Sequence, residues 1–449
     1  MSQGKIIRNR IEFSINNHHL SNYKLVRLDE ISEKIMSWPF WSSLKSESYL
    51  TEGVPFIRIK NIQNHTINEE DLVYISEIDN NKIKNSELNK WDIVLSKIWT
   101  IWEFALINFD KCNISENNIW IKLKQDNSIN NKYIFYYLTS SFIKNYLNNH
   151  LSWNVQKFLN VKTIKEIEIP LPPLEIQEQI VEKMDNAIAE KERLESESEE
   201  IMNSIDDYVL SELWIQLQKE QEEKKFFTVN IEDIKNWRLD VFYNKPEFKE
   251  IEKCILNSNY EVHRLWEYIN EIKYGASIKN NYSEKWIPFL RIKDIQANQI
   301  NIDEMVYLDV SERKNLWNCY VHEWDFLISR SWSIWIVALV NEKFEWFAYW
   351  SFMIKFNLRD DGLNKLYVSY RLNNKVNQII IEKEKIWAIQ QNITIDTIKD
   401  FYLPLPPKEI QDKIANEVKN RIEKANELKK QANEIYEQAK NEVEKMILE

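Results

Sequence analysis

Residues 91–108 read WDIVLSKIWTIWEFALIN, and residues 324–341 read WDFLISRSWSIWIVALVN. Both stretches contain, in the same order, an acid, an apolar run, a hydroxyl, a base, a second hydroxyl and a second apolar run. The displacement between them is 233 residues, from residue 91 to residue 324. Solenoid repeats have periods of about 20–50 residues, so this displacement indicates the tandem duplication of a whole domain.

Two further blocks repeat at nearly the same displacement. The segment VPFIRIKNIQ, which begins at Val54, matches IPFLRIKDIQ, which begins at Ile287. The segment IPLPPLEIQ at residues 169–177 matches LPLPPKEIQ at residues 403–411. Two similar domains on one chain suggest one extended ligand that is contacted twice.

The composition is that of a globular chain, with 44% hydrophobic and 29% charged residues. We see no N-terminal secretion signal and no apolar run of about 18 residues. Cys112, Cys254 and Cys319 form no CxxC pair, and we expect reduced core thiols in a cytoplasmic protein. The net charge of −11 argues mildly against a nucleic-acid partner, although two helical stretches hold much of the acid.

The chain has only 4 glycines but 18 tryptophans, and the repeat indicates why. Gly53 corresponds to Trp286 and Trp41 corresponds to Gly275, so the two residue types interchange at matched turns. A turn that needs a positive φ favours glycine and disfavours an indole. We therefore hypothesise that most of these tryptophans are UGA codons that the source organism reads as glycine. The alternative is a genuinely tryptophan-rich protein, and the intact mass of native protein would decide between the two. Further tryptophans at turn positions are Trp91, Trp99, Trp102, Trp324, Trp332 and Trp335.

Residues 54–62 alternate between apolar and polar types and predict a strand. Arg58 and Lys60 would share its outer face, as would Arg291 and Lys293 in the second repeat. A solvated strand face explains one such pair. Because the pair recurs, contacts with phosphates or bases are an equally good explanation.

We call the repeated stretch at residues 91–108 and 324–341 the opening motif. It predicts two strands joined by a tight turn in each repeat. A base flanked by hydroxyls at a turn suits phosphate contacts, and arginine can also read guanine edges. The alternative is an ordinary polar hairpin. The residues expected to project from these turns are Ser96, Lys97 and Thr100 in the first repeat and Ser329, Arg330 and Ser333 in the second.

A third candidate contact lies in residues 152–159 (SWNVQKFL), which match residues 386–393 (IWAIQQNI). Amide side chains can pair bidentately with adenine, although amides in loops more often form local turns. The candidate base readers are Asn154, Gln156 and Lys157, and Gln390, Gln391 and Asn392.

The proline-rich segments end each globular domain, and a long helix follows each of them. Apolar residues recur in these helices at an alternating spacing of four and three, which predicts coiled-coil pairing between them. Lys191 and Ser198 interrupt the first seam. Taken as about 45 residues, the first helix is roughly 65 Å long, enough to span about two turns of DNA at roughly 34–36 Å each.

Catalytic motifs are absent from the sequence. We find no phosphate-binding loop, no GxGxxG, no Asn/Asp-Pro-Pro-aromatic element and no HExxH or other metal-ligand spacing. The sequence therefore predicts no catalytic and no metal-binding residues, and a chain that binds and positions other molecules.

The ordered duplicate of these motifs resembles the specificity subunit of type I restriction–modification systems. The resemblance implies a non-enzymatic DNA-binding subunit without a cofactor of its own. Its partners would be double-stranded DNA, two methyltransferase subunits that carry S-adenosylmethionine and methylate adenine, and a possible endonuclease subunit. It also implies α/β (α+β) target recognition domains that read the two halves of an asymmetric site, with the long helices paired antiparallel to set the gap.

On this basis we divide the chain into an N-terminal arm (1–22), target recognition domain 1 (23–173), helix 1 (174–222), a lead-in with target recognition domain 2 (223–407) and helix 2 (408–449). Two alternatives stay open. The chain could be a protein-binding scaffold that does not touch DNA, or the specificity half of a single-chain restriction–methylation enzyme.

Overall fold

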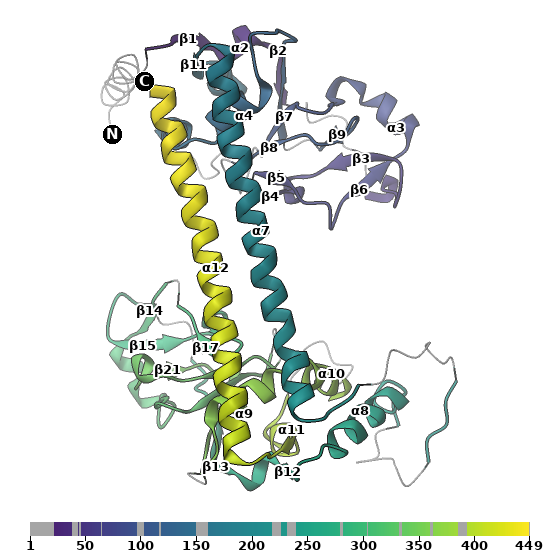
Figure 1. Ribbon diagram of the computed structural model, residues 1–449, viewed down its shortest axis with the longest axis vertical. Helices are drawn as coiled ribbons and strands as arrows, with labels where there is room; N and C mark the ends of the chain where they lie inside the picture. Colours follow the sequence, from purple (N-terminus) through teal and green to yellow (C-terminus); the bar gives the residue numbers. More distant parts are fainter. Residues whose placement is uncertain are drawn as a thin grey trace. The chain divides into compact units, whose positions relative to one another are not determined.

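The computed structural model of the chain divides into two compact units. Unit 1 comprises residues 1–195 and 429–449, and unit 2 comprises residues 196–428 (Figure 1). The boundaries therefore fall within the two long helices, so each unit holds one repeat and parts of both helices. The residues described are 22–37, 44, 46–63, 65–96, 103–115, 118–149, 160–217, 226–230, 239–278, 282–302, 304–331, 335–359, 362–384 and 393–448.

Unit 1 is built on small sheets with short helices. Its four-stranded antiparallel sheet has the order β2 (Ser32–Ser37), β10 (Asn118–Leu123), β7 (Ile93–Ser96), β8 (Phe104–Leu106). Its three-stranded sheet has the order β6 (Val73–Ile75), β3 (Val54–Ile57), β9 (Asn113–Ile114). Two antiparallel pairs join β1 (Lys24–Arg27) to β11 (Glu168–Leu171) and β4 (Ile62–Gln63) to β5 (Thr66–Ile67). The short helices are α2 (Leu28–Ile31), α3 (Glu77–Lys82), α4 (Asn131–Leu138), α5 (Ser141–Asn149), α6 (Val161–Lys165) and three 3-10 turns, η1 (Ser46–Ser48), η2 (Ile59–Asn61) and η3 (Lys84–Ser86).

Unit 2 repeats this plan. Its main sheet has the order β13 (Ile269–Tyr274), β22 (Met353–Leu358), β19 (Phe326–Ser329), β20 (Val337–Leu339). Its second sheet has the order β14 (Tyr282–Ser283), β18 (Tyr307–Leu308), β15 (Ile287–Leu290), β21 (Ala348–Tyr349). The two pairs are β12 (Val262–Arg264) with β23 (Tyr402–Pro404) and β16 (Ile295–Gln296) with β17 (Gln299–Ile300). The helices are α8 (Pro246–Leu256), α9 (Lys365–Asn373), α10 (Lys375–Glu384), α11 (Ile395–Lys399) and the 3-10 turns η6 (Leu265–Glu267), η7 (Ile292–Asp294), η8 (Val310–Lys314) and η9 (Glu342–Phe344). The matching strand orders confirm the duplication and the mixed α/β class.

The opening motif forms a strand that is buried on both faces in each unit. In β7, Ile93 and Leu95 pack into one apolar cluster, while Val94 packs into a second cluster on the opposite face. In β19, Phe326 packs into one cluster and Leu327 into another. A continuous apolar run is what such a doubly covered strand requires, because alternate side chains point to opposite faces.

The Pro-Pro-x-Glu-Ile-Gln block joins each domain to the helix that follows it. In unit 1, the buried Gln177 accepts a hydrogen bond from the Asn130 backbone N–H at 2.9 Å and donates to the Pro172 carbonyl at 2.8 Å. Gln411 makes the same pair of bonds in unit 2, with the Asn364 N–H at 3.0 Å and the Pro406 carbonyl at 2.9 Å. The glutamine recurs because one amide satisfies both backbone groups.

The long helices are α7 (Leu174–Glu212, 39 residues) and α12 (Lys408–Leu448, 41 residues). Helix α7 ends ten residues before the predicted position 222 and is about 58 Å long. No helix among the described residues is long and apolar enough to span a membrane.

Both long helices contribute to the core of each unit. In unit 1, residues such as Met184 of α7 and Val443 of α12 share one apolar cluster, and Lys191 lies over the Tyr436 ring at 5.0 Å. In unit 2, the buried Ser198 of α7 donates to the Ala425 carbonyl of α12 at 2.8 Å. The two residues that interrupt the predicted seam therefore contact the opposite helix.

One predicted element is wrong in its extent. The strand expected over residues 54–62 ends at Ile57, and η2 follows it before β4 begins.

Candidate nucleic-acid interface

The repeated arginines Arg58 and Arg291 hold matched turns together inside each unit. The Arg291 guanidinium donates to both carboxylate oxygens of Asp294 at 3.0 Å and to the Glu304 carbonyl at 2.8 Å. The hydrogen bonds that Arg291 donates to Asp294 raise the pKa of the Arg291 guanidinium. In unit 1, Arg58 donates to the carbonyl of Asp71, which occupies the position that matches Glu304. Because these bonds fix the fold, they explain the recurrence of the arginine without a ligand.

The lysines of the same segments are exposed. Lys60 pairs with the Asp71 carboxylate at 2.7 Å, and both side chains are solvent accessible. Lys293 of η7 is also exposed. The prediction that Arg58 and Lys60 share one strand face is wrong, because the chain turns into η2 after Arg58. Alternation in sequence could not reveal this turn.

The hydroxyls Ser96 and Ser329 do not project from a turn. Each is the last residue of a strand, β7 or β19, and each is fully buried. The Ser329 Oγ accepts a hydrogen bond from the Ile336 N–H at 2.8 Å. The prediction that these two hydroxyls face a ligand is therefore wrong, since both belong to the core.

Arg330 lies where two of the predicted motifs of unit 2 meet. Its carbonyl accepts a hydrogen bond at 3.2 Å from the N–H of Ile393, the last residue of the predicted amide segment. Its guanidinium carbon lies 4.7 Å from the centre of the Tyr274 ring. The fold therefore brings the basic residue of the opening motif to the end of the amide segment. Sequence reasoning missed Tyr274, although an aromatic also precedes the matched turn in the first repeat, at Phe40.

The remaining predicted contact residues lie outside the described residues, so their placement stays a prediction. They are Lys97, Thr100, Asn154, Gln156, Lys157, Ser333, Gln390, Gln391 and Asn392.

The backbone φ angles of several tryptophans are relevant to the hypothesis that tryptophan stands in place of glycine. Trp286 has a φ of 121°, close to the 134° of its counterpart Gly53. Among the described residues, nine that are not glycine have a positive φ, and six of these are tryptophans. The six are Trp91, Trp214, Trp286, Trp324, Trp335 and Trp346.

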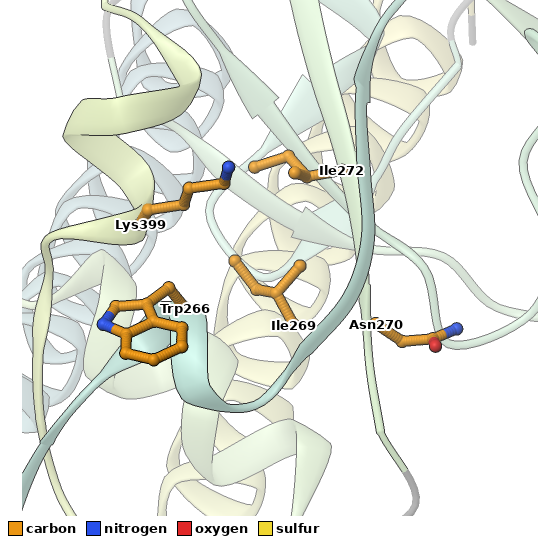
Figure 2. Close-up of a pocket in the computed structure, with 5 residues that line it drawn as sticks. All are labelled: Trp266, Ile269, Asn270, Ile272 and Lys399. Atoms are coloured by element: carbon orange, nitrogen blue, oxygen red, sulfur yellow. The ribbon is translucent and has the colours of Figure 1, made fainter.

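A cavity of about 450 Å³ opens beside β13 in unit 2, but the residues that line it do not form a catalytic site. Trp266 of η6 and Lys399 of α11 line it together with three residues of β13, and the amide of Asn270 points away from the other labelled side chains (Figure 2). Within the described part of the chain, no group of three His, Cys, Asp or Glu residues could hold a metal ion.

A family model described as "Type I restriction modification DNA specificity domain" matches residues 21–203 and, a second time, residues 257–437. The two matches cover most of the chain and coincide with the two repeats. The chain belongs to this family. Specificity subunits are non-catalytic components of restriction–modification complexes, and the role of this chain is DNA recognition.

Two relatives in the family are similar over most of their length. The type I restriction enzyme EcoKI specificity subunit of Escherichia coli K12 is 23% identical over 409 residues, which cover 88% of this chain and 81% of that protein. The EcoBI specificity subunit of Escherichia coli is 21% identical over 408 residues, covering 87% and 77%. A solved structure described as "Structural basis underlying complex assembly and conformational transition of the type I R-M system" covers 95% of this chain and 96% of its own, with 16% identity and a TM-score of 0.49.

Proposed function

We propose that this chain reads a two-part, asymmetric site in double-stranded DNA and positions methyltransferase subunits that modify adenine within it. The observation that carries the proposal is the repetition of one strand order, β2-β10-β7-β8 and β13-β22-β19-β20, in two separate units. Two copies of one reading domain suit two half-sites. The half-sites should differ, because the matched contact positions hold a lysine in one repeat and an arginine in the other, Lys97 and Arg330.

We further propose that α7 and α12 pair as an antiparallel coiled coil that sets the gap between the half-sites. Contacts within each unit support this pairing. In unit 1, Lys183 contacts Glu442 and Lys191 contacts Tyr436, so the α12 partner number falls as the α7 number rises. Ser198 with Ala425 and Glu212 with Lys413 follow the same rule in unit 2.

The methyltransferase partners would bring S-adenosylmethionine, and an endonuclease subunit could join the same complex in the cytoplasm. Methylation of adenine requires the base to leave the duplex stack, a task for the enzymatic subunits. The role of this chain is to hold those subunits at the DNA sequence that it recognises.

We also propose that most of the tryptophans in this sequence are glycine in the native protein. The positive φ angles at Trp91, Trp286 and Trp324 support it, because only glycine reaches such angles without strain. Mass spectrometry of protein from the native host tests it directly. A mass that matches 18 tryptophans would refute it.

The competing function is a scaffold that binds proteins alone, and charge removal separates the two. Arg58 and Arg291 are poor test sites, because their loss would disturb the fold. We would instead change the exposed Lys60 and Lys293 to alanine in the assembled complex. DNA affinity should fall by about 1 kcal/mol or less for each lysine that lies near a phosphate, with a shallower dependence on salt. Unchanged affinity and salt dependence would favour the scaffold.

A further inference from the structure

Arg330 differs from Arg291 of the same repeat in what its guanidinium contacts. Arg291 is saturated by Asp294 and by a backbone carbonyl. Arg330, in contrast, pairs with no carboxylate among the described residues, and its one side-chain hydrogen bond to them reaches the Ser351 carbonyl at 3.5 Å. Its Nε is shielded from solvent and has no hydrogen-bond partner among the described residues, and none of them accepts a hydrogen bond from its Nη2. The guanidinium therefore keeps donors for a ligand.

The backbone of Arg330 is fixed although its side chain is not saturated. Its N–H donates to the Phe352 carbonyl at 3.0 Å, and its own carbonyl accepts from the Ile393 N–H at 3.2 Å. It directly follows β19, a strand buried on both faces. A backbone fixed in this way limits the conformations that the Arg330 side chain can reach, which favours specific contacts over flexible ones.

The Tyr274 ring lies against the Arg330 guanidinium, whose central carbon is 4.7 Å from the ring centre. Tyr274 is the last residue of β13, and Ile354 of β22 is its partner in the sheet; Ile354 also pairs with Ile328, two residues before Arg330. The Tyr274 hydroxyl accepts from the Ile395 N–H at 3.4 Å, and its ring is partly exposed. Guanidinium groups stack on aromatic faces, and a stacked arginine loses less entropy when it forms hydrogen bonds.

The turn after Tyr274 depends on a close approach of two backbones. A Cβ atom at Gly275 would lie 2.2 Å from the Trp350 carbonyl oxygen, so only glycine allows β13 to end there. This contact holds Tyr274 beside the start of β22, within reach of Arg330.

We infer that Arg330 reads a guanine in the half-site recognised by unit 2, and that Tyr274 is the positioning residue that presents its guanidinium. A bidentate contact from arginine to guanine O6 and N7 is the commonest specific contact in the major groove. The inference rests on the proposed function and adds a base and a residue to it. In the first repeat the matched pair is Phe40 and Lys97, where a lysine can act only as a point charge, so the same base preference is not expected there.

The test maps methylated adenines by long-read sequencing, using the full chain assembled with its methyltransferase partner on a DNA library with randomised positions. In the Arg330→Ala complex, the preference for guanine at one position of one half-site should fall roughly 10- to 100-fold, while the other half-site and the gap stay unchanged. Arg330→Lys keeps the charge and should lose most of the same preference. The control is Arg313→Ala, which removes one exposed positive charge from η8 of the same unit and should leave the motif intact.

Tyr274 is tested by a conservative pair of variants. Tyr274→Phe keeps the ring and should retain the guanine preference, whereas Tyr274→Leu should lose part of it, by roughly 3- to 10-fold. Equal loss in both variants would overturn the positioning role. A two-part motif that Arg330→Ala leaves unchanged would overturn the inference alone. Absence of any two-part motif from the wild-type complex would overturn the proposed function and this inference together.

Discussion

Replacing Trp286 by glycine should stabilise the folded chain. Trp286 is held at a φ of 121°, in a region that glycine reaches freely and other residues reach only under strain. Its side chain is 60% exposed, and the Lys285 ammonium lies 5.3 Å from its ring, so little packing is lost with the indole. The matched residue of the first repeat is already glycine, Gly53, at a φ of 134°.

The expected gain follows from three opposing contributions. Relief of backbone strain contributes about 1–3 kcal/mol to the free energy of unfolding. The greater freedom of glycine in the unfolded chain offsets about 0.5–1 kcal/mol, and loss of the exposed contact with Lys285 offsets about 0.5–1 kcal/mol. At the midpoints of these ranges the net gain for Trp286→Gly is about 0.5 kcal/mol, and about 2.5 kcal/mol when the five exposed tryptophans at positive φ are replaced together. The other four are Trp91, Trp214, Trp324 and Trp346.

The assay is urea unfolding followed by circular dichroism, because this signal does not depend on the number of indoles. The control is Trp120→Gly, which removes a side chain buried in β10 and should lower the free energy of unfolding by about 3–5 kcal/mol or more. If the fivefold glycine variant unfolded at a lower urea concentration than the tryptophan chain, the argument that these sites belong to glycine would be wrong.

Three further results are expected. Gln177→Ala should lower the stability of unit 1 by roughly 3 kcal/mol in thermal unfolding, because it leaves the Asn130 N–H and nearby carbonyls without partners; an unchanged melting temperature would contradict this. Glu444→Ala should cost about 1 kcal/mol in urea unfolding, because its carboxylate accepts from the Ser141 N–H and hydroxyl at the start of α5, and no loss would contradict the capping role. Burial raises the pKa of the Cys112 thiol, so iodoacetamide should modify the other two cysteines of the native protein first, as read by peptide mass mapping, and early labelling of Cys112 would refute its burial.

The duplication and the class of fold could be predicted from the sequence because they depend on long-range identity and on apolar patterning. The runs around Val94 and Leu327 are apolar at consecutive positions, and the structure covers both faces of those strands. The class of the domain follows from such patterns. The exact pairing of β7 between β10 and β8 does not, because it depends on contacts between distant segments.

The candidate site could be predicted less well. Arg58 and Arg291 recur because they close turns. In the sequence, however, a recurring basic residue looks the same whether it stabilises the fold or binds a ligand. Ser96 and Ser329 follow apolar runs and are the last residues of buried strands, so a polar residue type concealed a core position. The sequence indicates Arg330 as a candidate, but its contact with Tyr274 spans 56 residues of sequence, and no local pattern encodes it.

The central claim is that the two units of this chain read the two halves of one DNA site. The most direct measurement is the map of methylated adenines produced by the glycine-restored chain assembled with its methyltransferase partner. The account predicts a single asymmetric motif with two specified parts and a gap of fixed length. A soluble, assembled complex that produced no methylation, or methylated one uninterrupted motif, would contradict it.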